Sequence, residues 1–442
     1  MKKSLFALSV FFLVMAQFAF AQKVAFTEYD LDNGLHVILH QDKSAPIVKV
    51  EVMYHVGSKD DPFERTGFAH YFEHLLFEGT KNIERGEWFK IVSSNGGTNN
   101  AGTSYDHTTY YEVFPANNLE LGLWMESERM LHPVINQIGV DTQNGVIKEE
   151  RRQIQDNRPY GNVISQVTLN LFPNHTYQSP IIGSMEHLDN AKLEEFIAFH
   201  NKFYVPNNAV LVVAGDFDEA QTKKWIQDYF GPIKKGQEIN RKKVEEKPIT
   251  ETLKATFEDP NIQIPMLVNA YRTPDMKSKD SKVLDMISSI LSDGKSSRMY
   301  KKIVDDKKMA LQIGAFNFSL EHYGMYLVYG LPMGEVTTAD LMKEIDEEIV
   351  KLQNELISER EYQKLMNAYE NQFVSSNSSA EGIASSLANY YTIFGDASLI
   401  NKQLEEYRSI TREDIQRVAK TYLNPNQRLI LDYIPTKDTA KN

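Results

Sequence analysis

The ends of the two halves of this chain carry the same pattern, which constrains the fold more than any other feature. Residues 196–212 read FIAFHNKFYVPNNAVLV, and residues 415–431 read IQRVAKTYLNPNQRLIL. In each, a helix with apolar residues at helical spacing runs into Pro-Asn and then an apolar strand, and an offset of 219 positions aligns Pro206 with Pro425. Convergent helix–turn–strand chemistry is the alternative to a duplication. A length of 442 residues exceeds what one core usually fills, so we expect two similar domains.

A charged segment separates the two halves. After Gly231-Pro232 come the residues IKKGQEINRKKVEEKP, which include almost no apolar side chains and are typical of a solvated linker. The sequence therefore predicts an N-terminal domain over residues 22–230, a linker over 231–248 and a C-terminal domain over 249–442. Two similar halves joined in this way suggest a clamshell with a cavity between them.

Local patterns predict the elements of the first domain. Val48, Val50 and Val52 alternate along one segment, so they lie on one side of a strand. The predicted elements are a hairpin at Asn33-Gly34, strands over 47–56 and 105–114, and helices over 64–78, 117–131 and 139–156.

The N-terminus resembles a secretory signal. Lys2 and Lys3 precede an apolar run from Leu5 to Phe20, and Ala19-Phe20-Ala21 fits the small-x-small cleavage rule. We expect residues 1–21 to be a signal peptide and the mature chain to be exported to a bacterial periplasm. An uncleaved membrane anchor is the alternative, although the run is shorter than the roughly 20 residues that a span needs.

Charge and cysteine content narrow the chemistry. Loss of Lys2 and Lys3 with the signal peptide changes the net charge from −12 to −14, and the pI is about 5.5. A nucleic-acid-binding chain needs a basic face, so this class is excluded, and no membrane association is expected after signal removal. The chain has no Cys, so a bound metal must be held by His and carboxylate side chains.

His70-Tyr71-Phe72-Glu73-His74 is the candidate metal motif. On a helix, His70 and His74 project from one face about one turn apart, which is the spacing that two ligands of one zinc ion require. Glu73 lies on the same side but is displaced, where a general base belongs. A surface helix with two solvated histidines is the alternative interpretation.

A catalytic zinc ion needs a third protein ligand, and the predicted helix over 139–156 offers one. Glu150 has Val146 and Ile154 one turn away on either side, so it lies on an apolar stripe that we expect to face inward, whereas Glu149 faces solvent. An inward carboxylate without a partner is costly, and a zinc ion removes that cost. We assign Glu150 as the third ligand; the alternative is a buried Glu paired with an Arg.

These residues resemble the pitrilysin/insulinase family of zinc metallopeptidases, whose signature is this inverted zinc motif. Residues 67–80, GFAHYFEHLLFEGT, are similar to the family's signature helix almost residue for residue, and Glu150 follows His74 by 76 residues, close to the family's spacing. The resemblance spans residues 25–436. It implies an α+β fold, in which two similar domains, each a mainly antiparallel sheet with flanking helices, form one half of a clamshell.

The resemblance also implies a substrate-binding edge. In relatives, a strand that follows a Gly-Gly loop takes the substrate main chain by β-addition, and the matching residues here are Asn100 and Ala101. Their alternative interpretation is an ordinary turn and strand. The implied substrate is a peptide or an unfolded segment.

Two departures from the family bear on activity. The family often has a Glu seven residues before the third ligand, which supports the ligands, and Gln143 stands there in this chain. Many active relatives also carry an Arg and a Tyr in the second half that reach the scissile carbonyl, and alignment on the SSRMY segment places Val304 and Leu311 there. Neither side chain donates a hydrogen bond. The second half has no zinc motif either, since Asp285, Ser288 and Ser289 align with His70, Glu73 and His74.

The sequence therefore predicts a zinc-dependent metalloendopeptidase, with Zn²⁺ on His70, His74 and Glu150 and with Glu73 as the base. It resembles the zinc-bearing member of a heterodimer such as the mitochondrial processing peptidase, whose partner supplies the Arg and Tyr; a homodimer is also possible. The alternative function is a non-catalytic, zinc-containing scaffold that holds peptides.

Overall fold

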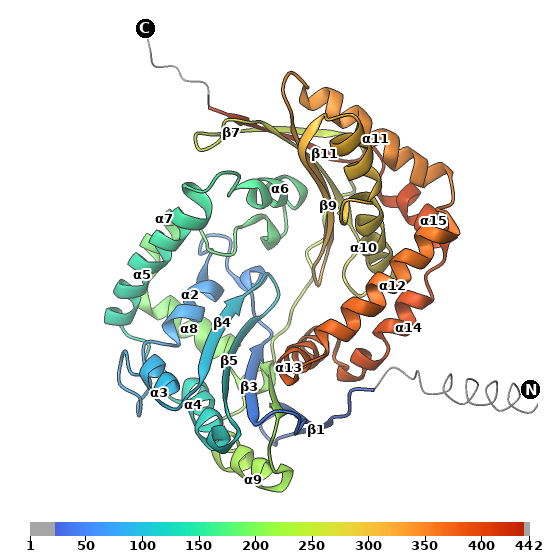
Figure 1. The fold of residues 1–442 in the computed structure, drawn as a ribbon. Helices are drawn as coiled ribbons and strands as arrows, with labels where there is room; N and C mark the ends of the chain where they lie inside the picture. The colour runs from blue at the N-terminus through green and yellow to red at the C-terminus, as the bar shows by residue number, and fades with distance from the viewer. Residues whose placement is uncertain (1–22, 437–442) are drawn as a thin grey trace, which may run out of the picture.

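The computed structural model describes residues 23–436, so the predicted signal peptide over 1–21 lies outside the described residues. The first half is built on a six-stranded sheet (Figure 1). In spatial order its strands are β1 (Thr27–Asp30), β2 (His36–Gln41), β6 (Ala209–Gly215), β3 (Ile47–Tyr54), β5 (Thr108–Pro115) and β4 (Thr98–Thr103). All neighbours pair antiparallel except β2 and β6, and β4 is an edge strand.

Helices of the first half flank this sheet. They are α2 (Phe68–Leu75), α3 (Trp88–Ser94), α4 (Leu119–Leu131), α5 (Gln137–Arg151), α6 (Val163–Leu171), α7 (Met185–Asn190), α8 (Leu193–Phe203) and α9 (Glu219–Phe230). The helix expected over 64–78 is shorter, because Gly67 takes a left-handed conformation at its start. The helix expected over 139–156 continues from α5 as a π-helical turn over Arg152–Asp156.

The second half has a five-stranded sheet and its own helices. Its strands, in spatial order, are β7 (Leu253–Asp259), β11 (Leu429–Pro435), β8 (Met266–Thr273), β10 (Gly324–Pro332) and β9 (Ala310–Ser319). The helices are α10 (Lys279–Ser292), a π-helical segment (Tyr300–Asp306), α11 (Thr338–Asn354), α12 (Glu359–Ser376), α13 (Ala380–Asn389), α14 (Gln403–Arg408) and α15 (Arg412–Tyr422). None of the helices in residues 23–436 is both long enough and apolar enough to cross a membrane.

Apart from β1, the two sheets share one topology. The order β2-β6-β3-β5-β4 in the first sheet corresponds strand for strand to β7-β11-β8-β10-β9 in the second. The one parallel pair has the same place in each, β2 with β6 and β7 with β11. Helix α8 leads into β6 and α15 leads into β11, which are the two segments that share the repeated pattern. The expected α+β fold with two similar sheets and flanking helices is confirmed.

Strand β3 shows how the first sheet is packed on both faces. Val48, Val50 and Val52 are fully buried in the main core of the first half, as their alternation predicts. The opposite face is covered by α13, which belongs to the second half in sequence. There Lys49 and Ser385 meet, with the Lys49 Nζ atom donating to Ser385 Oγ at 2.7 Å, and Ser385 donates to Glu51 at 3.0 Å.

A second contact between the halves is apolar. Side chains from α6 and the segment after it, such as Val167, Phe172 and Tyr177, pack with residues of the second sheet such as Val268 and Leu431. The region between Phe230 and β7 contains no helix or strand, yet it is anchored, because the Arg241 Nε atom lies 3.2 Å from an Asp60 carboxylate oxygen.

Buried charges also join the halves. The hairpin between β9 and β10 places Glu321 beside Lys59 of the first half, with 3.4 Å between the charged atoms. Lys59 is buried and also lies 3.1 Å from Asp60, while His55 lies 2.9 Å from Glu321. The two halves are therefore fixed against each other by apolar and ionic contacts.

Candidate metal centre and active site

The start of helix α2 is fixed by a buried carboxylate. Asp61 accepts hydrogen bonds from the backbone N–H of Gly67 at 2.7 Å and from that of Ala69 at 3.0 Å. These N–H groups have no partner within the helix, so the carboxylate caps them. Burial raises the pKa of Asp61 well above its ordinary value, although the two backbone donors oppose this shift. Sequence reasoning did not single out Asp61, which precedes the helix by several residues.

The far end of α2 is held by two polar side chains from other elements. The Tyr110 hydroxyl donates to the carbonyl of Phe72 at 2.7 Å, and Arg129 donates to the carbonyl of Leu76 at 2.9 Å. The Arg129 guanidinium is fully buried and is paired with Glu112 and Glu126. These bonds satisfy helix carbonyls on either side of His74, so they fix the orientation of the motif.

Helix α5 is attached to α2 directly. The Tyr71 hydroxyl donates to the carbonyl of Val140 at 2.5 Å, and Asn136 caps the start of α5 by accepting from Gly139 at 2.9 Å. On α2, Tyr71 and His70 are consecutive and face different sides, since successive helix residues are about 100° apart. Tyr71 thus binds the first turn of α5, while the two imidazoles meet its last turn at Glu150.

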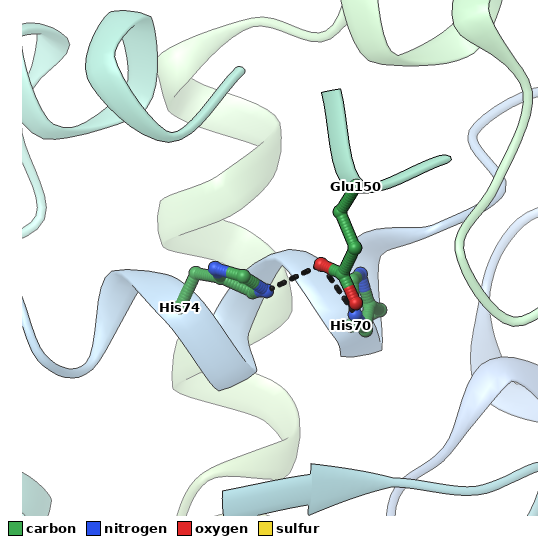
Figure 2. Close-up of side chains that lie close together, drawn as sticks. All are labelled: His70, His74 and Glu150. Atoms are coloured by element: carbon green, nitrogen blue, oxygen red, sulfur yellow. Dashed lines mark ion pairs between the residues drawn. The ribbon is translucent and has the colours of Figure 1, made fainter. Parts of the chain in front are cut away.

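The structure brings His70, His74 and Glu150 together (Figure 2). Oε2 of Glu150 lies 3.2 Å from Nε2 of His74 and 3.6 Å from Nε2 of His70. One possible ligand atom from each of the three residues lies within 4.8 Å of the others, and this is the one such group of three among the described residues. Hydrogen bonds to His70 and His74 hold the pKa of Glu150 far below its usual range.

Glu150 faces the two histidines, but the stripe around it is not a core stripe. Ile147 is buried, whereas Val146 is 46% exposed and Ile154 is 42% exposed. The expectation of an apolar, inward stripe was therefore wrong, because Val146 is exposed and because Glu150 and Ile154 line an open cavity. Glu149 is exposed and bonded to Arg152, as expected.

A cavity of about 500 Å³ opens beside the three residues. His70, Glu73 and Glu150 line it, together with Gly102 and Thr103 at the end of β4. Glu73 is half-buried, and its carboxylate lies 4.0 Å from Nε2 of His70. Its carboxylate therefore reaches the cavity next to the candidate ligands. The other lining residues are Tyr105, Ile154, Gln155, Arg158, Gly161, Ile164, Ser165, Pro180, Ile181, Ile182 and Phe318.

Asn100 and Ala101 lie on the edge strand. Asn100 pairs with Tyr111 and Ala101 with Tyr110, both on β5, so the other edge of β4 has no strand partner within residues 23–436. Neither residue lines the cavity, although Gly102 and Thr103 continue the strand into it. The predicted peptide-binding edge therefore leads to the metal group.

Gln143 does not contact the candidate ligands through a hydrogen bond. Its side-chain amide donates to Glu78 at 2.5 Å, just beyond the end of α2. Its Oε1 atom is buried and has no hydrogen-bond partner in the described part of the chain. Gln143 thus ties α5 to the segment after the motif, and its predicted support of the ligands stays a prediction.

The second half contributes little to this cavity. Phe318 of β9 lines it, whereas Val304 packs into the core of the second half and Leu311 is exposed on β9. At the position that aligns with His70, Asp285 accepts hydrogen bonds from Asn317 at 3.0 Å and Tyr407 at 3.2 Å. No hydrogen-bonding Arg or Tyr of the described second half lines the metal cavity.

The donor set fits zinc. Two imidazoles and a carboxylate are the ligands of many catalytic zinc sites, which keep one position open. The three donors converge from two helices fixed to each other, and the cavity lies on their open side. A zinc ion bound there would be held by His70, His74 and Glu150.

The fold and this group define an α+β protein with two similar sheets and a candidate zinc site, and the comparisons with known proteins identify its family. Residues 36–184 match the insulinase family, peptidase family M16, and residues 190–369 match the domain described as the peptidase M16 inactive domain. The chain belongs to peptidase family M16.

Individual relatives support this assignment. The zinc protease PqqE of Helicobacter pylori is 29% identical over 400 residues, which cover 90% of each chain. The crystal structure of a protease from Helicobacter pylori matches with a TM-score of 0.87 and 28% identity, over 93% of this chain and all of that one. The periplasmic protease PqqL of Escherichia coli shares the fold with a TM-score of 0.76 and 18% identity, over 95% of this chain and 48% of that one.

Proposed function

We propose that this protein is a zinc metalloendopeptidase that cleaves peptides or unfolded segments. The observation that carries the proposal is the convergence of His70, His74 and Glu150, with Glu73 beside them in the same cavity. The edge of β4 is open and leads into this cavity, so a peptide added to it would pass the metal group. Asn100 and Ala101 are the proposed main-chain contacts.

In the proposed mechanism, each side chain has one role. His70, His74 and Glu150 hold the metal ion, which when bound supplies Lewis acidity and lowers the pKa of a coordinated water. Glu73 takes the proton of the attacking water and returns it to the leaving amine. The pair Tyr71 and Val140 keeps the two ligand helices in register.

We further propose that the chain works as the zinc-bearing subunit of a pair. The lining of the cavity supports this, because among the described residues of the second half only Phe318 reaches it, and none of them brings a donor for the oxyanion. Loss of one such donor costs roughly 3–4 kcal/mol of transition-state stabilisation. In a heterodimer, a homologous subunit would supply an Arg and a Tyr; a homodimer is the alternative arrangement.

We also propose a division into residues 22–230, 231–248 and 249–442, and export to a bacterial periplasm after removal of residues 1–21. The basic and apolar character of the N-terminus supports export, and PqqL of Escherichia coli is described as periplasmic.

The second candidate function is a zinc-containing scaffold that holds peptides. Glu73 in the cavity favours the enzyme, since a scaffold needs no base there.

A chelator-sensitive assay tests the proposal. The purified chain, alone and mixed with a candidate homologous subunit, is incubated with quenched fluorescent peptides and zinc, and a chelator is then added. We expect weak or no cleavage by the chain alone, full cleavage by the mixture, and loss of cleavage with the chelator. Peptide binding without zinc-dependent cleavage in any mixture would support the scaffold, and equal activity with and without the partner would contradict the paired arrangement.

A further inference from the structure

Arg158 is the one basic residue besides His70 among the residues that line the metal cavity. The other charged groups of that wall are Glu73 and Glu150. The Arg158 side chain is exposed, and within residues 23–436 it takes part in no ion pair or side-chain hydrogen bond. The two arginines that precede it in the chain behave differently: Arg151 is bonded to Gly183 and paired with Asp156, and Arg152 is bonded to Glu149.

The loop that carries Arg158 has a fixed shape. Tyr160 has a positive φ of 61°, which a bulky residue adopts only where the surroundings impose it. The N–H of Gly161 donates to the carbonyl of Arg158 at 2.9 Å, and a Cβ at Gly161 would lie 2.4 Å from the carbonyl oxygen of Gln155. The backbone of this loop is therefore closely packed and needs glycine at this position.

The same loop is attached to the second half. The N–H of Tyr160 donates to Asp259 at 3.2 Å, and its hydroxyl donates to the carbonyl of Ile264 at 2.8 Å. Asn261 donates to the carbonyl of Asp156 at 2.8 Å. Contacts on both sides hold the backbone at Arg158, so this lining residue of the cavity stands on a fixed support.

Charge balance leaves this guanidinium without a counter-ion. A divalent cation on the His-His-Glu group would offset the two carboxylates, Glu73 and Glu150, and Arg158 would remain as net positive charge on the wall. The protein as a whole is acidic, with a net charge of −12, so this is a local feature and not part of a basic surface. A guanidinium binds carboxylates with two parallel hydrogen bonds, which gives geometric selectivity.

We propose that Arg158 is a specificity-determining residue that binds a carboxylate of the substrate within a few residues of the scissile bond. The carboxylate is an Asp or Glu side chain or the substrate's C-terminal carboxylate. The inference rests on the proposed peptidase function and adds a substrate class to it. A peptide that follows β4 past Gly102 and Thr103 enters the space in front of Arg158, since all three line one cavity.

The test uses the full chain with its partner. The substrates are pairs of quenched fluorescent peptides in which one peptide has Glu and the other has Gln at a single position near the scissile bond. Amidated and free C-termini separate the two sources of the carboxylate. We expect kcat/KM to be roughly 10- to 100-fold higher for the peptide with the carboxylate than for the neutral peptide, mostly because KM is lower. This preference should occur at one side-chain position or at the C-terminus. Arg158→Gln should abolish this preference by lowering kcat/KM for the carboxylate peptide to the value for the neutral peptide. Arg158→Glu should make the protein prefer Lys at that position.

Arg152→Gln is the matched control, since Arg152 is also exposed on this segment but does not line the cavity. It should keep the preference. The preference is also read without turnover, from fluorescence anisotropy of labelled peptides on the Glu73→Gln chain. No preference in the wild-type chain, or the same preference in Arg158→Gln, overturns the inference. If the wild-type chain with its partner cleaves no peptide but the anisotropy measurement shows selective binding of the carboxylate peptide, the peptidase function is refuted and the role of Arg158 is retained.

Discussion

The Nη1 atom of Arg129 donates a 2.9 Å hydrogen bond to the carbonyl oxygen of Leu76, two residues beyond His74. The same guanidinium lies over the rings of Phe77, Trp88 and Tyr110, at 4.0 to 4.4 Å from their centroids. A buried Arg of α4 thus binds the carbonyl at the end of the helix that carries the candidate metal motif. The motif helix is short, so its geometry depends on such contacts more than on its own length.

Arg129→Ala should therefore destabilise the protein strongly. Removal of the guanidinium leaves Glu112 and Glu126 buried without a cation, which costs about 3–5 kcal/mol of unfolding free energy. Urea unfolding of the wild-type protein and of Arg129→Ala measures the decrease in unfolding free energy. Arg408→Ala removes an exposed pair with Glu370 and should cost no more than about 1 kcal/mol. Similar losses for the two variants would contradict the role of the buried pair.

Glu150→Gln should weaken zinc binding. The variant keeps the shape of the side chain but removes the anionic donor, so zinc affinity should fall by more than the roughly 10- to 100-fold typical of residues behind a ligand. Competition with a zinc chelator measures it. Glu149→Gln changes the neighbouring, exposed carboxylate and should leave zinc affinity unchanged. Equal zinc affinity of wild type and Glu150→Gln would count against this ligand.

Glu73→Gln should keep zinc and lose turnover. The base is removed while the three candidate ligands remain, so kcat should fall by about 100- to 10,000-fold. Elemental analysis and the peptide assay are carried out on the same preparation. Loss of metal from this variant would indicate that Glu73 acts as a ligand or as a support of one, and not as the base.

Acid should weaken the junction between the halves through His175. Burial lowers the pKa of His175 to about 3, and the His322 ring beside it adds to this effect. The unfolded chain takes up a proton near pH 6.5, so below this pH it binds more protons than the folded chain and stability falls. The loss begins near pH 6.5, is complete near pH 3, and reaches about 2 kcal/mol at pH 5.

Urea unfolding at pH 7 and pH 5 measures this effect. In His175→Gln the side chain cannot titrate, so the difference in unfolding free energy between the two pH values should shrink by about 2 kcal/mol. His322→Gln tests the neighbouring ring in the same way. An unchanged pH dependence in both variants would show that other groups cause the acid sensitivity.

Much of the site followed from local sequence. The spacing of His70, Glu73 and His74 specifies one helix face, and the structure has these residues on α2. The apolar neighbours of Glu150 predict an inward side chain, and it does face the histidines, although Val146 and Ile154 are both exposed and Ile154 lines the cavity. Periodicity reports which residues share a face of a helix; it does not report whether that face meets a core or an opening.

The sequence by itself determined the two similar halves, the residue types of the candidate metal group and the helical spacing of its histidines, because repeats and spacing can be read along the chain without knowledge of how it packs. Only the tertiary structure decided that Asp61, Arg129 and Tyr71 fix that helix, that α13 crosses to the first sheet, and that Arg158 reaches the metal cavity. These are contacts between segments far apart in the chain. No local pattern encodes them, since they depend on how complete elements pack.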